Sequence, residues 1–187
     1  MGTKEQLEPS EVHADVSQWV RVTLEGVAWL VSPAYYAPVG IGQAKAIAEA
    51  LGCELPTPAL VDAIWRAADL RVPPDLMVRS HDGVHMDTPE LHEQQREALE
   101  RFLAGRCLGV DFRMIAGCFK DVVQVDGKVG LYGWHADVEA AKALGRKGIT
   151  THAPATPGSG VVVQPLFFGH APAWRDYSQG LRLCRRA

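Results

Sequence analysis

Two neighbouring apolar runs in the second half of the chain constrain its fold most strongly. Residues 114–125 and 129–134 are rich in β-branched and aromatic side chains, and the dipeptide Asp126-Gly127 lies between them. An Asp-Gly pair between two such runs is typical of a tight β-hairpin turn. We therefore predict two antiparallel strands here. The β-rich residues 161–168 and the final segment, residues 177–184, predict two more strands.

The first half of the chain combines a hairpin with helices. Two short apolar runs flank the turn Glu25-Gly26 and predict an N-terminal β-hairpin over residues 19–31. Thr57-Pro58 and Thr88-Pro89 are typical of the N-cap and first position of a helix. The expected helices cover residues 41–51, 57–68, 88–105 and 137–144. The segments expected to be loops are residues 71–88 and a flexible stretch, 150–160.

The composition is that of an ordinary globular protein. Of 187 residues, 47% are hydrophobic and 22% are charged. Because helices come early and strands late, we predict an α+β fold in which an N-terminal β-hairpin and helices precede a mostly antiparallel sheet. We expect a flexible N-terminus over residues 1–16 and a single domain over residues 17–187.

Charge and hydropathy exclude several classes of partner. The net charge of -3 lacks the basic footprint of a nucleic-acid binder. No apolar run is long enough to span a membrane, and the polar N-terminus does not resemble a secretory signal, so we expect a cytoplasmic protein. The cysteines show no CxxC spacing, and we expect them to be reduced thiols. They are Cys53, Cys107, Cys118 and Cys184.

The common catalytic and nucleotide-binding motifs are missing from the sequence. It contains no G-x-S-x-G elbow, Walker loop, Rossmann fingerprint, HExxH helix or EF-hand loop. We therefore expect no cofactor.

Polar residues that can carry chemistry gather instead at the ends of the predicted C-terminal strands. His135 follows Tyr-Gly-Trp and His170 follows Phe-Gly, which places each imidazole where a rigid strand meets solvent. The alternative is that each histidine only bonds a backbone carbonyl at its strand end. The candidate catalytic residues are Lys120, Asp121, His135, His170, Asp176 and Ser178. The candidate substrate-binding residues are His92, Tyr132, Trp134, Gln164, Trp174, Tyr177 and Arg182.

These residue types favour a hydrolase-type enzyme that uses general acid–base or nucleophilic chemistry on an amide, ester or glycosidic bond. The substrate would be a small molecule or an oligomer. In this hypothesis His135 is the base, Asp121 or Asp176 orients it, and Ser178 is the nucleophile. Cys118 is a second possible nucleophile, although a thiol inside an apolar strand is more typical of an inert core residue.

Two basic residues complete the hypothesis. Lys120 and Arg182 would stabilise the negative charge that develops during the reaction.

Several short motifs occur in the same order as in a known family. They are Lys-Asp-Val-Val, Tyr-Gly-Trp-His, Gln-Pro-Leu, Gly-His and Asp-Tyr-Ser-x-Gly-x-Arg-Leu, preceded by Leu-Pro-Thr at residues 55–57. This series resembles a family of uncharacterised bacterial proteins over roughly residues 30–185, with a longer insertion here at about 136–160. The family pattern also has a histidine at the position of His92. The resemblance implies no particular reaction.

Two positions depart from that family pattern. Gln179 stands where the family has a histidine after Asp-Tyr-Ser, and Cys118 stands where it has a histidine before Lys-Asp. If the first family histidine is a catalytic base, this chain is inactive or uses another base.

Two other functions remain open at this point. Aromatic side chains beside the polar cluster favour a non-catalytic small-molecule binding or resistance protein that uses the same pocket. Imidazoles and carboxylates also favour a metal-dependent enzyme. Its ligands would come from His81, Asp82, His85, Asp87 and His92, or from His135 and His170 with a carboxylate.

Overall fold

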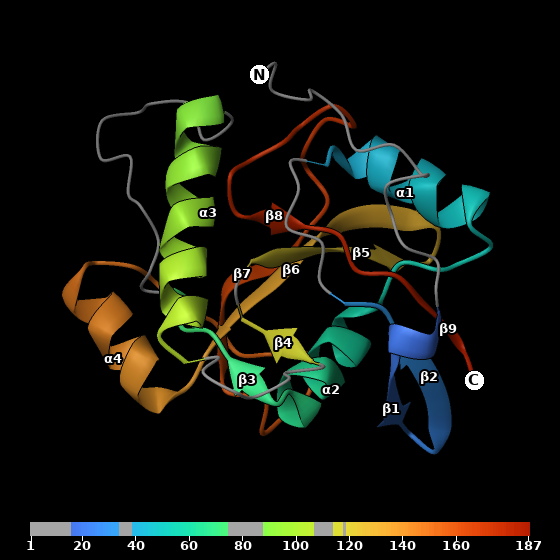
Figure 1. Ribbon diagram of the computed structural model, residues 1–187, viewed down its shortest axis with the longest axis horizontal. Helices are drawn as coiled ribbons and strands as arrows, with labels where there is room; N and C mark the ends of the chain where they lie inside the picture. The colour runs from blue at the N-terminus through green and yellow to red at the C-terminus, as the bar shows by residue number, and fades with distance from the viewer. Residues whose placement is uncertain (1–15, 34–38, 75–87, 107–113, 118) are drawn as a thin grey trace.

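The computed structural model describes residues 16–33, 39–74, 88–106, 114–117 and 119–187 (Figure 1). The predicted α+β class is confirmed, since an N-terminal hairpin and helices precede a mostly antiparallel sheet. The helices are α1 (Ile41–Ala50), α2 (Pro58–Ala67), α3 (Pro89–Ala104) and α4 (Val138–Arg146), with a 3-10 turn at Val16–Gln18. Among the described residues no helix combines the length and the apolar character that a membrane crossing needs.

The strands form three sheets. The first is antiparallel in the order β1-β2-β9, from Val20–Leu24, Val27–Val31 and Cys184–Arg186. The second pairs β3 (Leu70–Arg71) with β4 (Ile115–Ala116) in parallel. The third has the order β7-β6-β5-β8, from Val161–Phe167, Lys128–Ala136, Lys120–Val125 and Gln179–Gly180. Only the short β8 runs parallel to its neighbour in this four-stranded sheet.

Local sequence signals explain why the main elements begin where they do. Asp126 and Gly127 adopt φ of 48° and 76°, and β5 and β6 pair antiparallel on either side of them, as the dipeptide predicts. At the start of α2, the hydroxyl of Thr57 accepts a hydrogen bond from the Leu60 amide over 3.2 Å. At the start of α3, the hydroxyl of Thr88 accepts one from the Leu91 amide over 3.3 Å. At the start of α4, the carboxylate of Asp137 accepts a hydrogen bond from the Ala140 amide.

The C-terminal segment differs from its prediction. Instead of one strand over residues 177–184, the chain forms β8 beside β5 and then β9 beside β2. Between them, the side chains of Leu181 and Leu183 are fully buried in the main hydrophobic core. These two buried residues connect the two sheets. An apolar sequence pattern alone does not indicate that a segment leaves one sheet and joins another.

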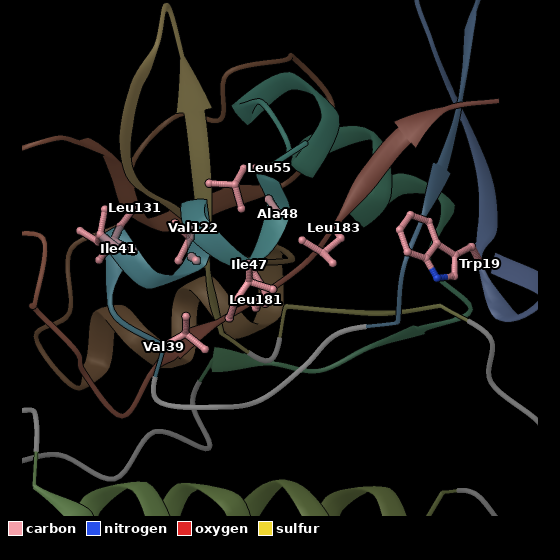
Figure 2. Packing of buried hydrophobic residues seen from close by; sticks show 11 residues of the cluster. Trp19, Val39, Ile41, Ile47, Ala48, Leu55, Val122, Leu131, Leu181 and Leu183 are labelled. Carbon is pink, nitrogen blue, oxygen red and sulfur yellow. The ribbon is translucent and has the colours of Figure 1, made fainter. Parts of the chain in front are cut away.

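Helices α1 and α2 cover opposite faces of the four-stranded sheet (Figure 1). On one face, Ile47 of α1 packs with Val122 and Leu131 in the cluster drawn in Figure 2. On the other face, Val61 of α2 packs with Val123 and Tyr132. Because successive side chains of a strand alternate between faces, neighbouring residues of β5 belong to two different layers of the molecule.

Candidate functional site

A buried group of polar side chains lies where β5 begins and β8 pairs with it. We call Lys120, Asp176, Ser178 and Gln179 the Asp176 cluster. The Nζ of Lys120 donates to Oδ2 of Asp176 over 2.7 Å, and the Ser178 amide donates to Oδ1 over 2.7 Å. The Ser178 hydroxyl also donates to Oδ1. All four side chains are buried, so these charge-assisted bonds form in a medium of low polarity.

The backbone holds the Asp176 cluster in place. The parallel pairing of β5 with β8 sets Lys120 beside Gln179, and the Lys120 amide donates to the carbonyl of Ser178 over 2.6 Å. The side chain of Gln179 accepts a hydrogen bond from the Asp176 amide over 2.7 Å. The lysine therefore comes from one strand, and the carboxylate and hydroxyl come from the turn that precedes its neighbour.

Aromatic rings surround the Asp176 cluster. The ammonium of Lys120 lies 5.5 Å from the centre of the Trp134 ring, and Trp134 meets Tyr177 edge to face. Trp134 has a φ of 59° inside β6, a conformation that is uncommon for a bulky residue. Such strain is found most often at functional sites.

His170 forms the accessible edge of this region. Its ring stacks on Trp174 at 4.8 Å, and the side chain is half-buried. Desolvation lowers the pKa of His170, and the positive charge of Lys120 lowers it further, while Asp176 opposes the shift. The shift favours the neutral imidazole, which has a nitrogen able to accept a proton.

A second buried polar group lies on the opposite face of the sheet. We call Asp62, Tyr132 and His135 the Asp62 network. The Oδ1 of Asp62, on α2, bonds the hydroxyl of Tyr132 over 2.8 Å and Nε2 of His135 over 2.7 Å. The amide of Thr156 donates to the other carboxylate oxygen, and the amide of Ala155 donates to the Tyr132 hydroxyl over 2.6 Å.

The Asp62 network is enclosed. His135 is 2% exposed, Asp62 is 0% exposed, and the indole of Trp65 stacks on the imidazole at 5.4 Å. Burial raises the pKa of Tyr132, so its hydroxyl stays protonated and donates a hydrogen bond to Asp62. The network ties α2 and β6 to residues 155–156, in the stretch that we expected to be flexible. These two amides are thus fixed by bonds to buried side chains.

The carboxylate of Asp121 belongs to neither group. It accepts a hydrogen bond from Nε of Arg182 over 3.1 Å, and the guanidinium also donates to the carbonyl of Ile115 over 3.0 Å. Burial raises the pKa of Asp121, while the charge and hydrogen bond of Arg182 and the nearby imidazole of His135 oppose that shift. This pair links β5 to the segment between β8 and β9. It is a buried structural ion pair rather than an accessible site.

The structure does not bring His135 and Ser178 together as the catalytic hypothesis required. The hydrogen-bond partner of His135 is Asp62. Asp121 lies within electrostatic range of His135, but the hydrogen bonds of its carboxylate within the described residues go to Arg182. Lys120 and Asp121 follow one another in β5 and point to opposite faces. The sheet therefore lies between the imidazole of His135 and the hydroxyl of Ser178.

The remaining predicted residues divide between the Asp176 cluster and the surface. Leu91 of α3 packs with Trp134 and Tyr177, which brings the buried face of α3 over the cluster, and His92 lies in the same turn. Gln164 is peripheral, because its side-chain amide donates to the neighbouring carbonyl of Pro165 in an exposed position. Cys118, the second candidate nucleophile, lies outside the described residues.

Sequence reasoning missed Asp62. It stands between Val61 and Ala63 in α2, where a single acidic residue is typical of a solvated helix face. The usable signal was that it falls within an otherwise apolar stretch, residues 58–65, all of which except Ala59 are buried. A carboxylate on the buried face of a helix needs hydrogen-bond partners, and those partners are 70 and 73 residues away.

The described residues contain no group of three or more histidine, cysteine, aspartate or glutamate side chains placed to hold a metal ion. The alternative ligands expected in the segment before α3, namely His81, Asp82, His85 and Asp87, lie outside the described residues.

Comparison of the chain with protein-family models, with curated proteins and with solved structures yields no match.

Proposed function

We propose that the protein is a hydrolase-type enzyme that acts on an ester or amide bond, with the Asp176 cluster and His170 as its reacting groups. The observation that carries the proposal is the hydrogen bond from the buried Ser178 hydroxyl to Asp176. It lies beside the ammonium of Lys120 and within electrostatic range of a neutral, half-exposed imidazole. A nucleophile, a proton acceptor, a fixed positive charge and an accessible base thus converge on one side of the sheet.

In the proposed reaction the Oγ of Ser178 attacks the carbonyl carbon of the substrate. Its proton passes to the Asp176 carboxylate, to which it already donates, and then to the departing alkoxide or amine. The Lys120 ammonium stabilises the negative charge on the carbonyl oxygen in the transition state. His170 then takes a proton from water, which attacks the acyl group on Ser178. The proton returns to the serine oxygen, and the carboxylic acid leaves.

Two features of the Asp176 cluster support a site rather than a structural contact alone. The Nε2 of Gln179 is buried, and it has no hydrogen-bond partner among the described residues. A buried donor without a partner lowers the stability of the folded protein unless a ligand or a water molecule accepts a hydrogen bond from it. The positive φ of Trp134 is the second feature, because the strained residue forms the wall against Lys120.

A second candidate function is small-molecule binding without turnover at the same cluster. It is favoured by two buried donors, Nε2 of Gln179 and Nε1 of Trp174, neither of which has a hydrogen-bond partner in the part of the chain that the structure describes. Such donors suit a carbonyl or carboxylate oxygen of a ligand.

Burst kinetics test the enzyme and separate the two functions. With p-nitrophenyl butyrate, we expect a rapid release of about one p-nitrophenolate per chain, followed by a slower steady rate. The Ser178→Ala variant should lose the burst. Ser159→Ala, which removes an equally buried hydroxyl bonded to Arg66, should keep it. A wild-type trace without a burst, or a burst that survives in Ser178→Ala, would overturn the proposal.

A further inference from the structure

A small pocket with two arginines lies outside the proposed reacting site. It has a volume of about 140 Å³ and is lined by Trp65, Arg71, Phe102, Arg106 and Asp137, among others. These residues come from the ends of α2 and α3, from β3 and from the residue that begins α4, which lie near one another in Figure 1. None of them belongs to the Asp176 cluster.

Each guanidinium in the pocket is held against an aromatic ring. Arg71 lies over Trp65, 5.2 Å from the ring centre, and Arg106 lies over Phe102 at 4.3 Å. Arg71 is also fixed by bonds to the carbonyls of Trp65 and Arg66, over 3.1 and 3.0 Å. An arginine held in this way needs little further ordering to bind a ligand, and several of its N–H groups remain unused by these two bonds.

The two positive charges in the pocket have no ion-pair partner among the residues that the structure describes. Across the ranges that the structure describes, neither Arg71 nor Arg106 forms a salt bridge with a carboxylate. The carboxylate of Asp137 lines the pocket too, but it accepts a hydrogen bond from the Ala140 amide as the cap of α4. The lining therefore carries two positive charges and one negative charge.

We propose that this pocket binds a small organic monocarboxylate with a planar apolar body. The guanidinium groups match the planar fork of a carboxylate, and the indole and phenyl rings match a flat apolar group. A single net positive charge suits a monoanion, whereas Asp137 would repel the second charge of a phosphate dianion. The volume is below that of pockets for drug-sized ligands and suits one ring with its carboxylate.

The pocket also contacts the interior of the protein. The indole of Trp65 that forms its wall stacks on the imidazole of His135 in the Asp62 network. A bound carboxylate would thus contact the indole that stacks on His135. This indole lies on the face of the sheet away from Ser178. The inference is independent of the proposed hydrolase activity.

Titration calorimetry with benzoate as the probe tests the inference on the full chain. We expect saturable binding with a Kd of about 1 mM, or -4.1 kcal/mol, which weakens as sodium chloride is raised. Benzamide, which has the same shape without the charge, and inorganic phosphate should bind at least tenfold more weakly.

Variants assign the benzoate site. Arg71→Gln and Arg106→Gln should each raise the Kd about tenfold, since each loses a charged hydrogen-bond donor. Arg101→Gln is the matched control, because Arg101 is an exposed arginine of α3 that pairs with Glu97 outside the pocket. Arg106 makes no side-chain hydrogen bond within the described ranges, so its variant is expected to fold even if Arg71→Gln does not. Absent benzoate binding, equal affinity for benzamide or phosphate, or an unchanged Kd in Arg106→Gln would overturn the inference.

Discussion

The Asp62 network and the Asp176 cluster each consist of a buried carboxylate that accepts at least three hydrogen bonds, yet they differ in what surrounds them. Asp62 accepts from Tyr132, His135 and the Thr156 amide, and the imidazole of His135 is 2% exposed and stacks on Trp65. Beside Asp176 lie a half-exposed imidazole and the buried Nε2 of Gln179, which has no partner among the described residues. A closed network stabilises the fold, whereas a cluster with an unused donor and an accessible base is suited to a ligand.

The largest expected effect is on stability, at Asp62. In Asp62→Asn an NH₂ group replaces one carboxylate oxygen. This new donor then faces another donor, either the Thr156 amide or the side chains from β6, and one hydrogen bond is lost. We expect a loss of about 3 kcal/mol in the free energy of unfolding, or roughly 10 °C in Tm. Urea denaturation and a thermal scan measure it.

Asp126→Asn is the matched control, because Asp126 is exposed in a turn with positive φ that asparagine also adopts. A Tm for Asp62→Asn equal to that of the control would show that the Asp62 network does not stabilise the fold.

A smaller loss of stability is expected when His135 is removed. His135→Ala deletes one donor to Asp62 and the ring that stacks on Trp65, and we expect about 1–3 kcal/mol of destabilisation. The burst with p-nitrophenyl butyrate should persist in the folded variant, since the sheet separates His135 from Ser178. His152→Ala, at an exposed histidine, is the control. If His135→Ala were as stable as the wild type but gave no burst, the Asp62 network would be the reacting site, and this would contradict the comparison.

The smallest expected effect is a shift in the titration of His170. Its pKa should lie below the ordinary value of 6.5, because the imidazole is desolvated and near the ammonium of Lys120. The unfolded chain then binds this proton more readily than the folded one, so stability is lost as the pH falls through the pKa of the folded protein. Lys120→Met should raise the pKa toward 6.5. NMR of the imidazole resonances measures both values, and an unchanged or lower midpoint in Lys120→Met would contradict the assigned proximity.

The same contrast shows how far sequence reasoning reaches in this protein. Elements with local signals were predicted well, such as the helices that begin at Thr57 and Thr88 and the hairpin at Asp126-Gly127. Strands of two residues, such as β3 and β8, are too short for a periodic pattern.

Lys120, Asp176 and Ser178 of the Asp176 cluster were named from the sequence because they lie near predicted strand ends. Gln179 was noted only as a departure from the family pattern. The grouping of these side chains apart from His135 was not predicted. It depends on which face of the sheet each residue occupies. It also depends on the bond between His135 and Asp62, which lie 73 residues apart in the sequence.

Mapping a covalent adduct tests the central claim most directly. The protein is treated with an alkyl fluorophosphonate, which modifies activated serine hydroxyls, and is then digested with trypsin for mass spectrometry. We predict a single adduct on Ser178, in the peptide of residues 176–182, at wild-type yield in His135→Ala and absent from Ser178→Ala. An unmodified Ser178, or an adduct at a serine outside the Asp176 cluster, would contradict the assignment of this cluster as the reacting site.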